Sequence, residues 1–91
     1  MTPQEFYDEL KALADQKGIK IRLETGNFDG GLCTVDSQRI ILVNRRHHQT
    51  KRINVLARAL HEVGLDDIYV KPALRDRIDD EVAISLNTHS E

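Results

Sequence analysis

The sequence has no tryptophan, and it contains only two phenylalanines, two tyrosines and one cysteine. A core with so few aromatic rings has to be built from leucine, isoleucine, valine and alanine side chains. A single cysteine cannot form an internal disulfide, so nothing points to an oxidising compartment. The sequence also opens without the basic and then apolar stretch of a signal peptide. We therefore expect a cytoplasmic protein.

Long hydrophobic runs are missing as well. No apolar stretch approaches the ~20 residues that span a bilayer, so no membrane partner is expected. A chain of 91 residues is long enough for one small core. We expect a single domain over residues 1–86 and a frayed C-terminal tail over residues 87–91.

The formal net charge of −2 hides an uneven distribution of charged residues. Residues 37–61 include basic side chains and no acidic one, whereas acidic residues dominate from Glu62 onward. Such a segregation is typical of an anion-binding surface, and it also arises when two parts of one domain attract each other. The sequence is compatible with an anion-binding surface and with attraction between two parts of the domain.

The N-terminal segment carries the signals of a helix over residues 3–17. Thr2 and Glu5 stand at the two positions of a capping box, and Pro3 suits the first helical turn. Apolar residues then recur at helical spacing, and Gly18 is typical of the residue that follows a helix. The apolar stripe predicts a helix packed on the core.

Strands are expected next. Alternating apolar and charged residues predict a half-buried strand over residues 19–24. A second strand is expected over residues 32–35, and a tight turn at residues 36–38 leads into the most apolar strand, residues 39–43. Four consecutive apolar residues predict that this last strand is covered on both faces, within a hairpin at the centre of the sheet.

Two further helices complete the predicted fold. Thr50 is a candidate N-cap for a helix over residues 51–63 that ends at Gly64. Residues 66–70 are expected to form an extended connector or an edge strand, and a last helix is expected at about residues 72–84. The predicted class is α+β, in the order α-β-β-β-α-(β)-α, with a small antiparallel sheet packed against the helices.

The motif nearest to a catalytic signature is His61-Glu62 in the predicted middle helix. In the His-Glu-x-x-His motif, two histidines one turn apart bind zinc and the glutamate acts as a base. Here the fourth residue after His61 is Leu65, and Gly64 is expected to end the helix before it. The pattern at His61 therefore does not supply a zinc site.

The zinc motif can also be aligned with the same helix at an earlier residue, and this alignment gives a resemblance to a known family. Residues 30–64 combine a hairpin strand with a helix that contains Val55-Leu56-Ala57-x-x-Leu60, and this combination resembles the core of compact zincin-like metallopeptidases. The resemblance implies that Arg58 and Glu62 stand at the two zinc-ligand positions and Ala59 at the position of the base. Arginine stays protonated and alanine has no basic group, so the resemblance implies a zincin-like scaffold without its metal site. We expect no metal and no cofactor.

The whole chain is also similar to a family of small uncharacterised bacterial proteins. The likeness rests on a Gly-Gly-Leu-Cys segment, a Leu-Ala-Arg-Ala-Leu helix and a Pro-Ala-x-Arg sequence further on. It implies a family without implying a function. The glycine pair Gly30-Gly31 is expected to serve the geometry of a turn rather than an anion-binding nest.

Cys33 with His47 or His48 is a candidate nucleophilic pair, because a reactive thiolate needs a nearby base. Cys33 is expected in a strand among apolar neighbours, where a small core residue is the more common role. The two adjacent histidines have no third ligand at a recognised spacing, so no metal site is predicted there.

A basic cluster is expected where the third strand leads into the middle helix. A helix N-terminus adds partial positive charge and free N–H groups, so the cluster is suited to phosphate or another anion. Nucleic acid is one such ligand, but the slightly negative net charge and the lack of stacking aromatics do not favour it. The candidate anion-binding residues are Arg45, Arg46, Lys51 and Arg52.

These patterns favour a small non-catalytic binding or assembly domain on a zincin-like scaffold. Its expected partner is another protein or a second copy of the chain. The alternative is an anion- or nucleic-acid-binding protein that uses the basic loop 45–52. An active zinc metallopeptidase ranks third.

Overall fold

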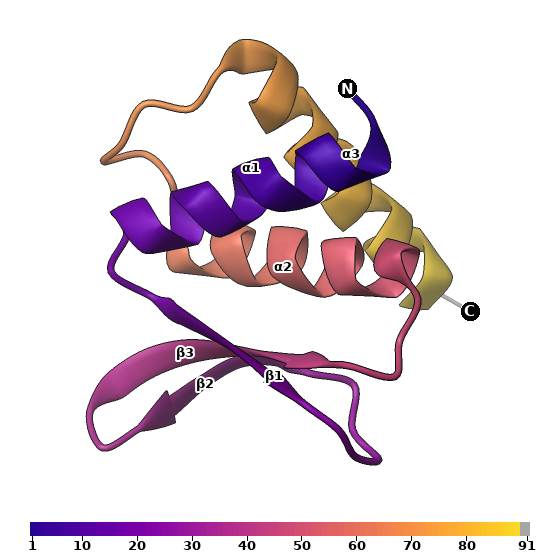
Figure 1. Cartoon of the computed structure of the whole chain (residues 1–91). Helices are drawn as coiled ribbons and strands as arrows, with labels where there is room; N and C mark the ends of the chain where they lie inside the picture. Colours follow the sequence, from indigo (N-terminus) through magenta and orange to yellow (C-terminus); the bar gives the residue numbers. More distant parts are fainter. Residues whose placement is uncertain (90–91) are drawn as a thin grey trace.

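The computed structural model describes the backbone of residues 1–89 and the side chains of residues 1–84. Within this part of the chain, helices and strands follow in the order α-β-β-β-α-α (Figure 1). The predicted α+β class is confirmed. The helices are α1 (Pro3–Gln16), α2 (Gln49–Val63) and α3 (Pro72–His89), and the strands are β1 (Lys20–Glu24), β2 (Gly31–Val35) and β3 (Gln38–Asn44).

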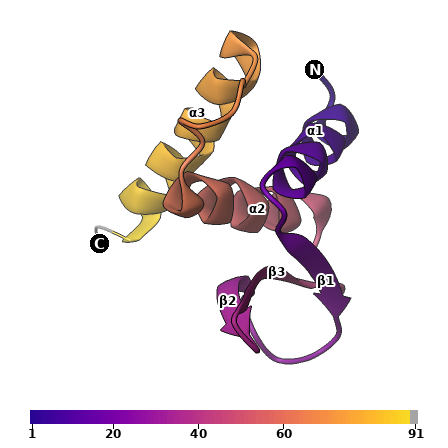
Figure 2. The same ribbon diagram turned by 90° about the vertical axis from the view of Figure 1, so that its left-hand side faces the viewer.

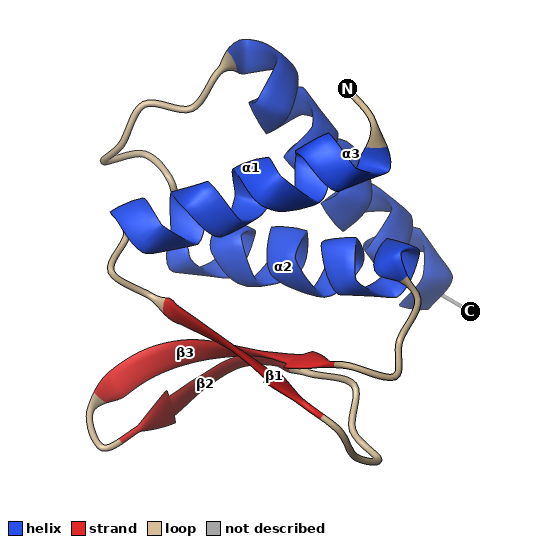
Figure 3. Cartoon of the chain, in the orientation of Figure 1, coloured by secondary structure: helices blue, strands red, loops and turns tan. Residues whose placement is uncertain are grey.

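The helices lie on one side of the sheet (Figure 3), in which β3 is the central strand between β1 and β2. β2 and β3 form the predicted hairpin, and the positive φ values of Asp36 (50°) and Ser37 (69°) are those of a tight turn that follows the twist of the strands. β1, however, pairs with β3 in parallel. The predicted antiparallel sheet is therefore wrong, because residues 25–30 carry the chain to the far edge before β3 returns beside β1.

The core lies between the sheet and the helices. α1 and α3 both pack against α2, and the inner faces of β2 and β3 cover α2 from the other side. Each fully buried aliphatic or aromatic side chain contributes about 1.5–3 kcal/mol to stability. Among the described side chains, the largest that are fully buried are Phe6, Leu10, Ile41, Val43, Leu56, Leu60, Leu74 and Ile78.

β3 is buried along most of its length, but the predicted cover on both faces is wrong, because the helices lie on only one side of the sheet (Figure 3). Ile40 lies on the other face, where the register places it between Lys20 and Cys33, and it is only 5% exposed. Cys33 is half-buried on that same face. The expected core position of Cys33 is wrong, because the core-facing residue of β2 is its neighbour Leu32, which pairs with the fully buried Ile41.

The helix ends follow the sequence signals with one exception. The capping box between Thr2 and Glu5 is present, and Gly64 ends α2 with a φ of 93°. α2 begins before Thr50, however, because His48 is its N-cap residue and makes no side-chain capping bond. α3 continues beyond the predicted residue 84 to His89, and residues 90–91 lie outside the described chain.

Residues 66–70 form a connector and not an additional strand. Lys17 binds the side chain of Asp67, and this ion pair holds the pKa of the Asp67 carboxyl below its ordinary value. Lys71 lies 3.5 Å from the carboxylate of Glu9. Both contacts join the connector region to α1. Within the described residues, no helix combines the length and the apolar character required to cross a membrane.

Asn44 is a buried polar residue that joins two loops at the end of β3. Its Nδ2 donates to the carbonyl oxygens of Gly26 (2.9 Å) and Phe28 (2.8 Å), and its Oδ1 accepts from the backbone N–H of Arg46 (3.0 Å). With 2% exposure, this side chain would be costly to bury without those partners. Asn44 therefore fixes the path of residues 25–30 toward β2.

Gly30 makes a close backbone approach at the start of β2. Its φ of 91° is a conformation that favours glycine, and an added Cβ would lie 2.4 Å from the carbonyl oxygen of Leu42. The same Cβ would lie 3.4 Å from Val55 Cγ1 in α2. Gly30 thus has a steric role in the fold, which agrees with the expected use of the glycine pair in chain geometry.

A matched pair of variants tests this contact. Gly31 has a φ of 136° but no atom within 4 Å of an added Cβ, so Gly31→Ala carries backbone strain without a clash. Gly30→Ala carries both. We expect the free energy of unfolding, measured in urea, to be lower for Gly30→Ala than for Gly31→Ala by about 1–3 kcal/mol. Equal stabilities would contradict the close approach.

Candidate functional site

A groove of about 700 Å³ lies between the edge of β2 and one face of α2. Gly31 and Leu32 line it from β2, and Val82 lines it from α3. Figure 2 shows β2 at the sheet edge on the side of α3, whereas α1 lies over the opposite edge at β1. The lining residues from α2 are Asn54, Val55, Arg58, Ala59, His61 and Glu62.

The hydrogen bonds of β3 determine which backbone groups of β2 face outward. The N–H of Arg45 donates to the carbonyl oxygen of Glu24 (2.8 Å), so the odd-numbered residues at this end of β3 face β1 and the even-numbered residues face β2. Cys33 pairs with an even-numbered residue and therefore faces β3. Successive residues of a strand alternate in direction, so Leu32 and Thr34 point their N–H and C=O groups toward the open edge.

The floor of the groove combines apolar and charged side chains. Val55 (8% exposed) and Ala59 (3% exposed) form its buried part. Arg58 and Glu62 are exposed one helical turn apart, a spacing that suits an ion pair. Among the side chains that the structure describes, neither forms an ion pair or a hydrogen bond. Both charges are therefore available to a ligand in the groove.

One end of the groove carries a second pair of charges. Lys51 Nζ lies 3.9 Å from Asp29 Oδ1, which links the start of α2 to the loop before β2. Both side chains are largely exposed, so this contact contributes little to stability. Lys51 thus belongs to the groove as much as to the basic cluster that the sequence predicts.

The groove coincides with the positions that the zincin resemblance assigns to a metal site. Arg58, Ala59 and Glu62 all line it, and they present a guanidinium, a methyl group and a carboxylate. A single carboxylate beside a permanent cation is a poor ligand set for zinc. Within the described residues, no group of three His, Cys, Asp or Glu side chains is placed to hold a metal ion.

Metal analysis tests this chemistry directly. Protein purified without a histidine tag is expected to contain far less than one zinc per chain, because the positions that the resemblance assigns to zinc ligands are an arginine and a single carboxylate, Arg58 and Glu62. Elemental analysis of the purified protein, with the dialysis buffer as control, gives the ratio. A zinc content near one per chain would restore the metallopeptidase interpretation.

The side chains of the predicted basic cluster contact different parts of the protein. Arg52 Nε donates to the carbonyl oxygen of His47 (2.9 Å), and its Nη2 donates to that of Arg45 (2.6 Å). Arg52 therefore holds the backbone of the loop in place. Arg46 and His47 line a separate cavity of about 430 Å³ next to residues 26–29. Anion binding by Arg45, Arg46, Lys51 and Arg52 stays a prediction.

The candidate pair of Cys33 with His47 or His48 receives no support. Cys33 lies on the outer face of an edge strand, opposite Ile40. His47 is half-buried in the loop after β3, and its Nδ1 has no hydrogen-bond partner within the described part of the chain. Neither histidine is hydrogen-bonded to Cys33 in that part, so the thiol lacks the base that nucleophilic chemistry requires.

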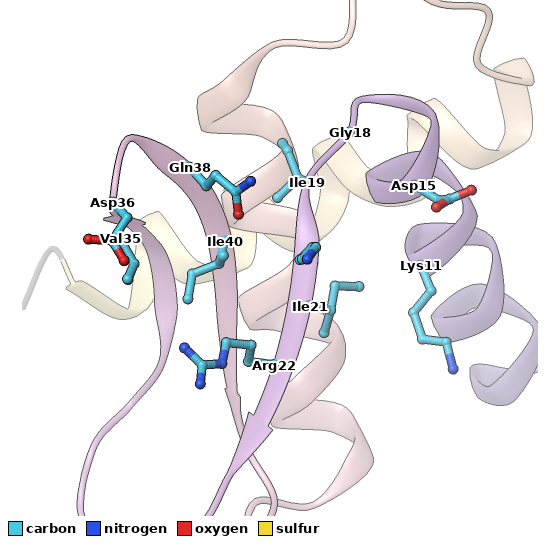
Figure 4. A pocket seen from close by; sticks show the side chains of 11 residues that line it. Lys11, Asp15, Gly18, Ile19, Ile21, Arg22, Val35, Asp36, Gln38 and Ile40 are labelled. Atoms are coloured by element: carbon cyan, nitrogen blue, oxygen red, sulfur yellow. The ribbon is translucent and has the colours of Figure 1, made fainter.

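A second cleft of about 650 Å³ lies around β1 and extends to β3 and the hairpin turn. Figure 4 shows Lys11 and Asp15 of α1 on one side of β1, and Ile40 of β3 on the other. The ammonium of Lys11 already lies 5.3 Å from the ring centre of Tyr7. β1 itself carries alternating charges, and charged side chains along an edge strand commonly protect it from pairing. The groove beside β2 is the stronger candidate.

Comparison of the chain with family models, with curated proteins and with solved structures finds no match. The zincin-like scaffold and the similarity to small bacterial proteins therefore stay predictions from the sequence.

The sequence does not reveal Leu32 and Thr34 as residues of a site. Their role depends on β2 being an edge strand, whereas the sequence predicts a hairpin at the centre of the sheet. Only Gly30-Gly31 marks this region in the sequence, as a place where the backbone takes an unusual conformation.

Proposed function

We propose that this chain is a non-catalytic binding domain, which takes an extended segment of a partner protein into the groove between β2 and α2. The open edge of β2 directly beside the groove carries the proposal. Leu32, which lines the groove, and Thr34, which follows it along the same edge, each offer an N–H donor and a C=O acceptor. An extended segment would continue the sheet as a fourth strand, a common mode of peptide recognition.

The composition of the groove supports binding without catalysis. Arg58 and Ala59 occupy positions where a zincin-like enzyme would need a metal ligand and a base. The groove is lined by no Ser, Thr or Cys side chain within the described residues. The scaffold would therefore keep the surface on which a peptide lies and lack the groups that cleave it.

The dimensions of the groove favour a short segment over a folded domain. Ligand sites commonly measure about 300–1,000 Å³, and 700 Å³ is within that range. Val55 and Ala59 supply apolar area, while the edge of β2 supplies directional hydrogen bonds. We also propose a cytoplasmic location, which the single cysteine favours.

Selection from a display library of short random peptides tests the proposal. Thr34→Pro removes an outward-facing N–H of β2 without removing a hydrogen bond to β3. We expect it to weaken the binding of a selected peptide about tenfold, the equivalent of ~1.4 kcal/mol, as measured by fluorescence anisotropy. Thr34→Val is the matched control, because it keeps the N–H and loses only the hydroxyl.

Mapping the selected peptide by NMR completes the test. The amide signals of residues 31–35 and those of the groove face of α2 are expected to shift together. The proposal fails if Thr34→Pro and Thr34→Val bind the peptide equally, or if the shifts cluster on another surface of the protein.

A further inference from the structure

We infer that the segment bound in the groove carries a basic and an acidic side chain two residues apart, with the basic residue first. The acidic side chain pairs with Arg58 and the basic one with Glu62. This inference rests on the proposed function, because it gives the chemistry of the partner at the same site. The two groove charges carry it, since neither forms an ion pair or a hydrogen bond within the described side chains.

The spacing of the two charges suits an extended chain. Arg58 and Glu62 are four residues apart, which is about 6 Å along a helix that rises 1.5 Å per residue. In an extended segment, side chains two residues apart lie on one face and are separated by about 6.6–6.8 Å. The two distances agree within the reach of long side chains. The residue between them points away from α2 and is left unrestricted.

For a segment antiparallel to β2, the order of its two charged side chains follows from the arrangement of β2 and α2. Figure 1 shows both elements running the same way along the molecule, from the side of the α2 N-terminus toward the hairpin turn. Antiparallel pairs are the more common kind of strand pair. A segment antiparallel to β2 therefore passes Glu62 before it reaches Arg58. This order places the basic residue N-terminal to the acidic one.

The surroundings of the two charges make them selective. Val55 and Ala59 are buried beside them, and a bound segment would remove much of the remaining water. Ion pairs gain strength when water is removed, whereas a covered charge without a partner is costly. A neutral segment would leave Arg58 and Glu62 with only each other as possible partners. The charges thus discriminate among segments more than they add affinity.

The charges at the end of the groove do not alter this assignment. Lys51 and Asp29 already face each other at 3.9 Å, and they balance one another. His61 lines the groove beside Glu62 and is exposed. Arg58 and Glu62 remain the charges whose partner the structure does not supply within its described residues.

A charge exchange tests the inference. Three synthetic versions of one library-selected peptide are compared, with Lys-x-Glu, Glu-x-Lys or Gln-x-Gln at the two groove-facing positions. The wild-type protein is expected to bind the Lys-x-Glu version about tenfold more tightly than the Glu-x-Lys version, a difference of ~1.4 kcal/mol. The double variant R58E/E62R is expected to reverse this order, as measured by fluorescence anisotropy at low salt.

The double variant keeps the net charge and alters only exposed positions, so its thermal unfolding is expected to match that of the wild type. If it is less stable, R58Q and E62Q replace it, and each is expected to reduce the preference for Lys-x-Glu. Equal binding of the three peptides, or a preference for Glu-x-Lys in the wild type, overturns the inference.

The two proposals fail in different ways. If Thr34→Pro loses binding but the protein binds all three peptide versions equally, strand addition is supported. In that case Arg58 and Glu62 have no role in recognition. Unchanged binding in Thr34→Pro would remove strand addition itself. Higher salt is expected to reduce the preference for Lys-x-Glu, because ion pairs at a groove surface are screened.

Discussion

The backbone of Gly30 lies against the carbonyl group of Leu42, at a distance that leaves no room for a side chain. This contact holds the first residues of β2 against β3 and beside Val55 of α2. Asn44 fixes the preceding loop through the carbonyl groups of Gly26 and Phe28. Because of these constraints, an open strand edge and an exposed helix face lie next to each other. Every property that we propose for the groove depends on that placement.

The sequence allowed the local elements to be predicted well and their assembly less well. The capping box of α1, the hairpin turn and the glycine that ends α2 depend on short-range chemistry, which neighbouring residues reveal. The parallel pairing of β1 with β3 depends on the path of residues 25–30, and Asn44 determines that path through bonds over 16 and 18 positions. The edge position of β2, and with it the groove, therefore could not be read from residue patterns.

The positions that suggested a zincin-like scaffold line the groove that we propose as a binding site. The resemblance assigns Arg58 and Glu62 to the two ligand positions of a zinc motif, and both residues line the groove. A cation and a carboxylate without partners in the described chain can each recognise a ligand group of opposite charge. The basic cluster is different, because the Arg52 side chain already donates hydrogen bonds to the loop carbonyls of Arg45 and His47. Residue type alone therefore does not show whether a charged side chain binds the backbone of its own fold or stays exposed.

Amide hydrogen exchange tests the central claim most directly, because it reports on the edge of β2 residue by residue. In the free protein, the amides of Leu32 and Thr34 are expected to exchange fast, whereas that of Cys33 is protected by β3. A peptide that adds a strand is expected to slow exchange at Leu32 or Thr34 and to leave Cys33 unchanged. Fast exchange at both edge amides in the saturated complex would contradict the account.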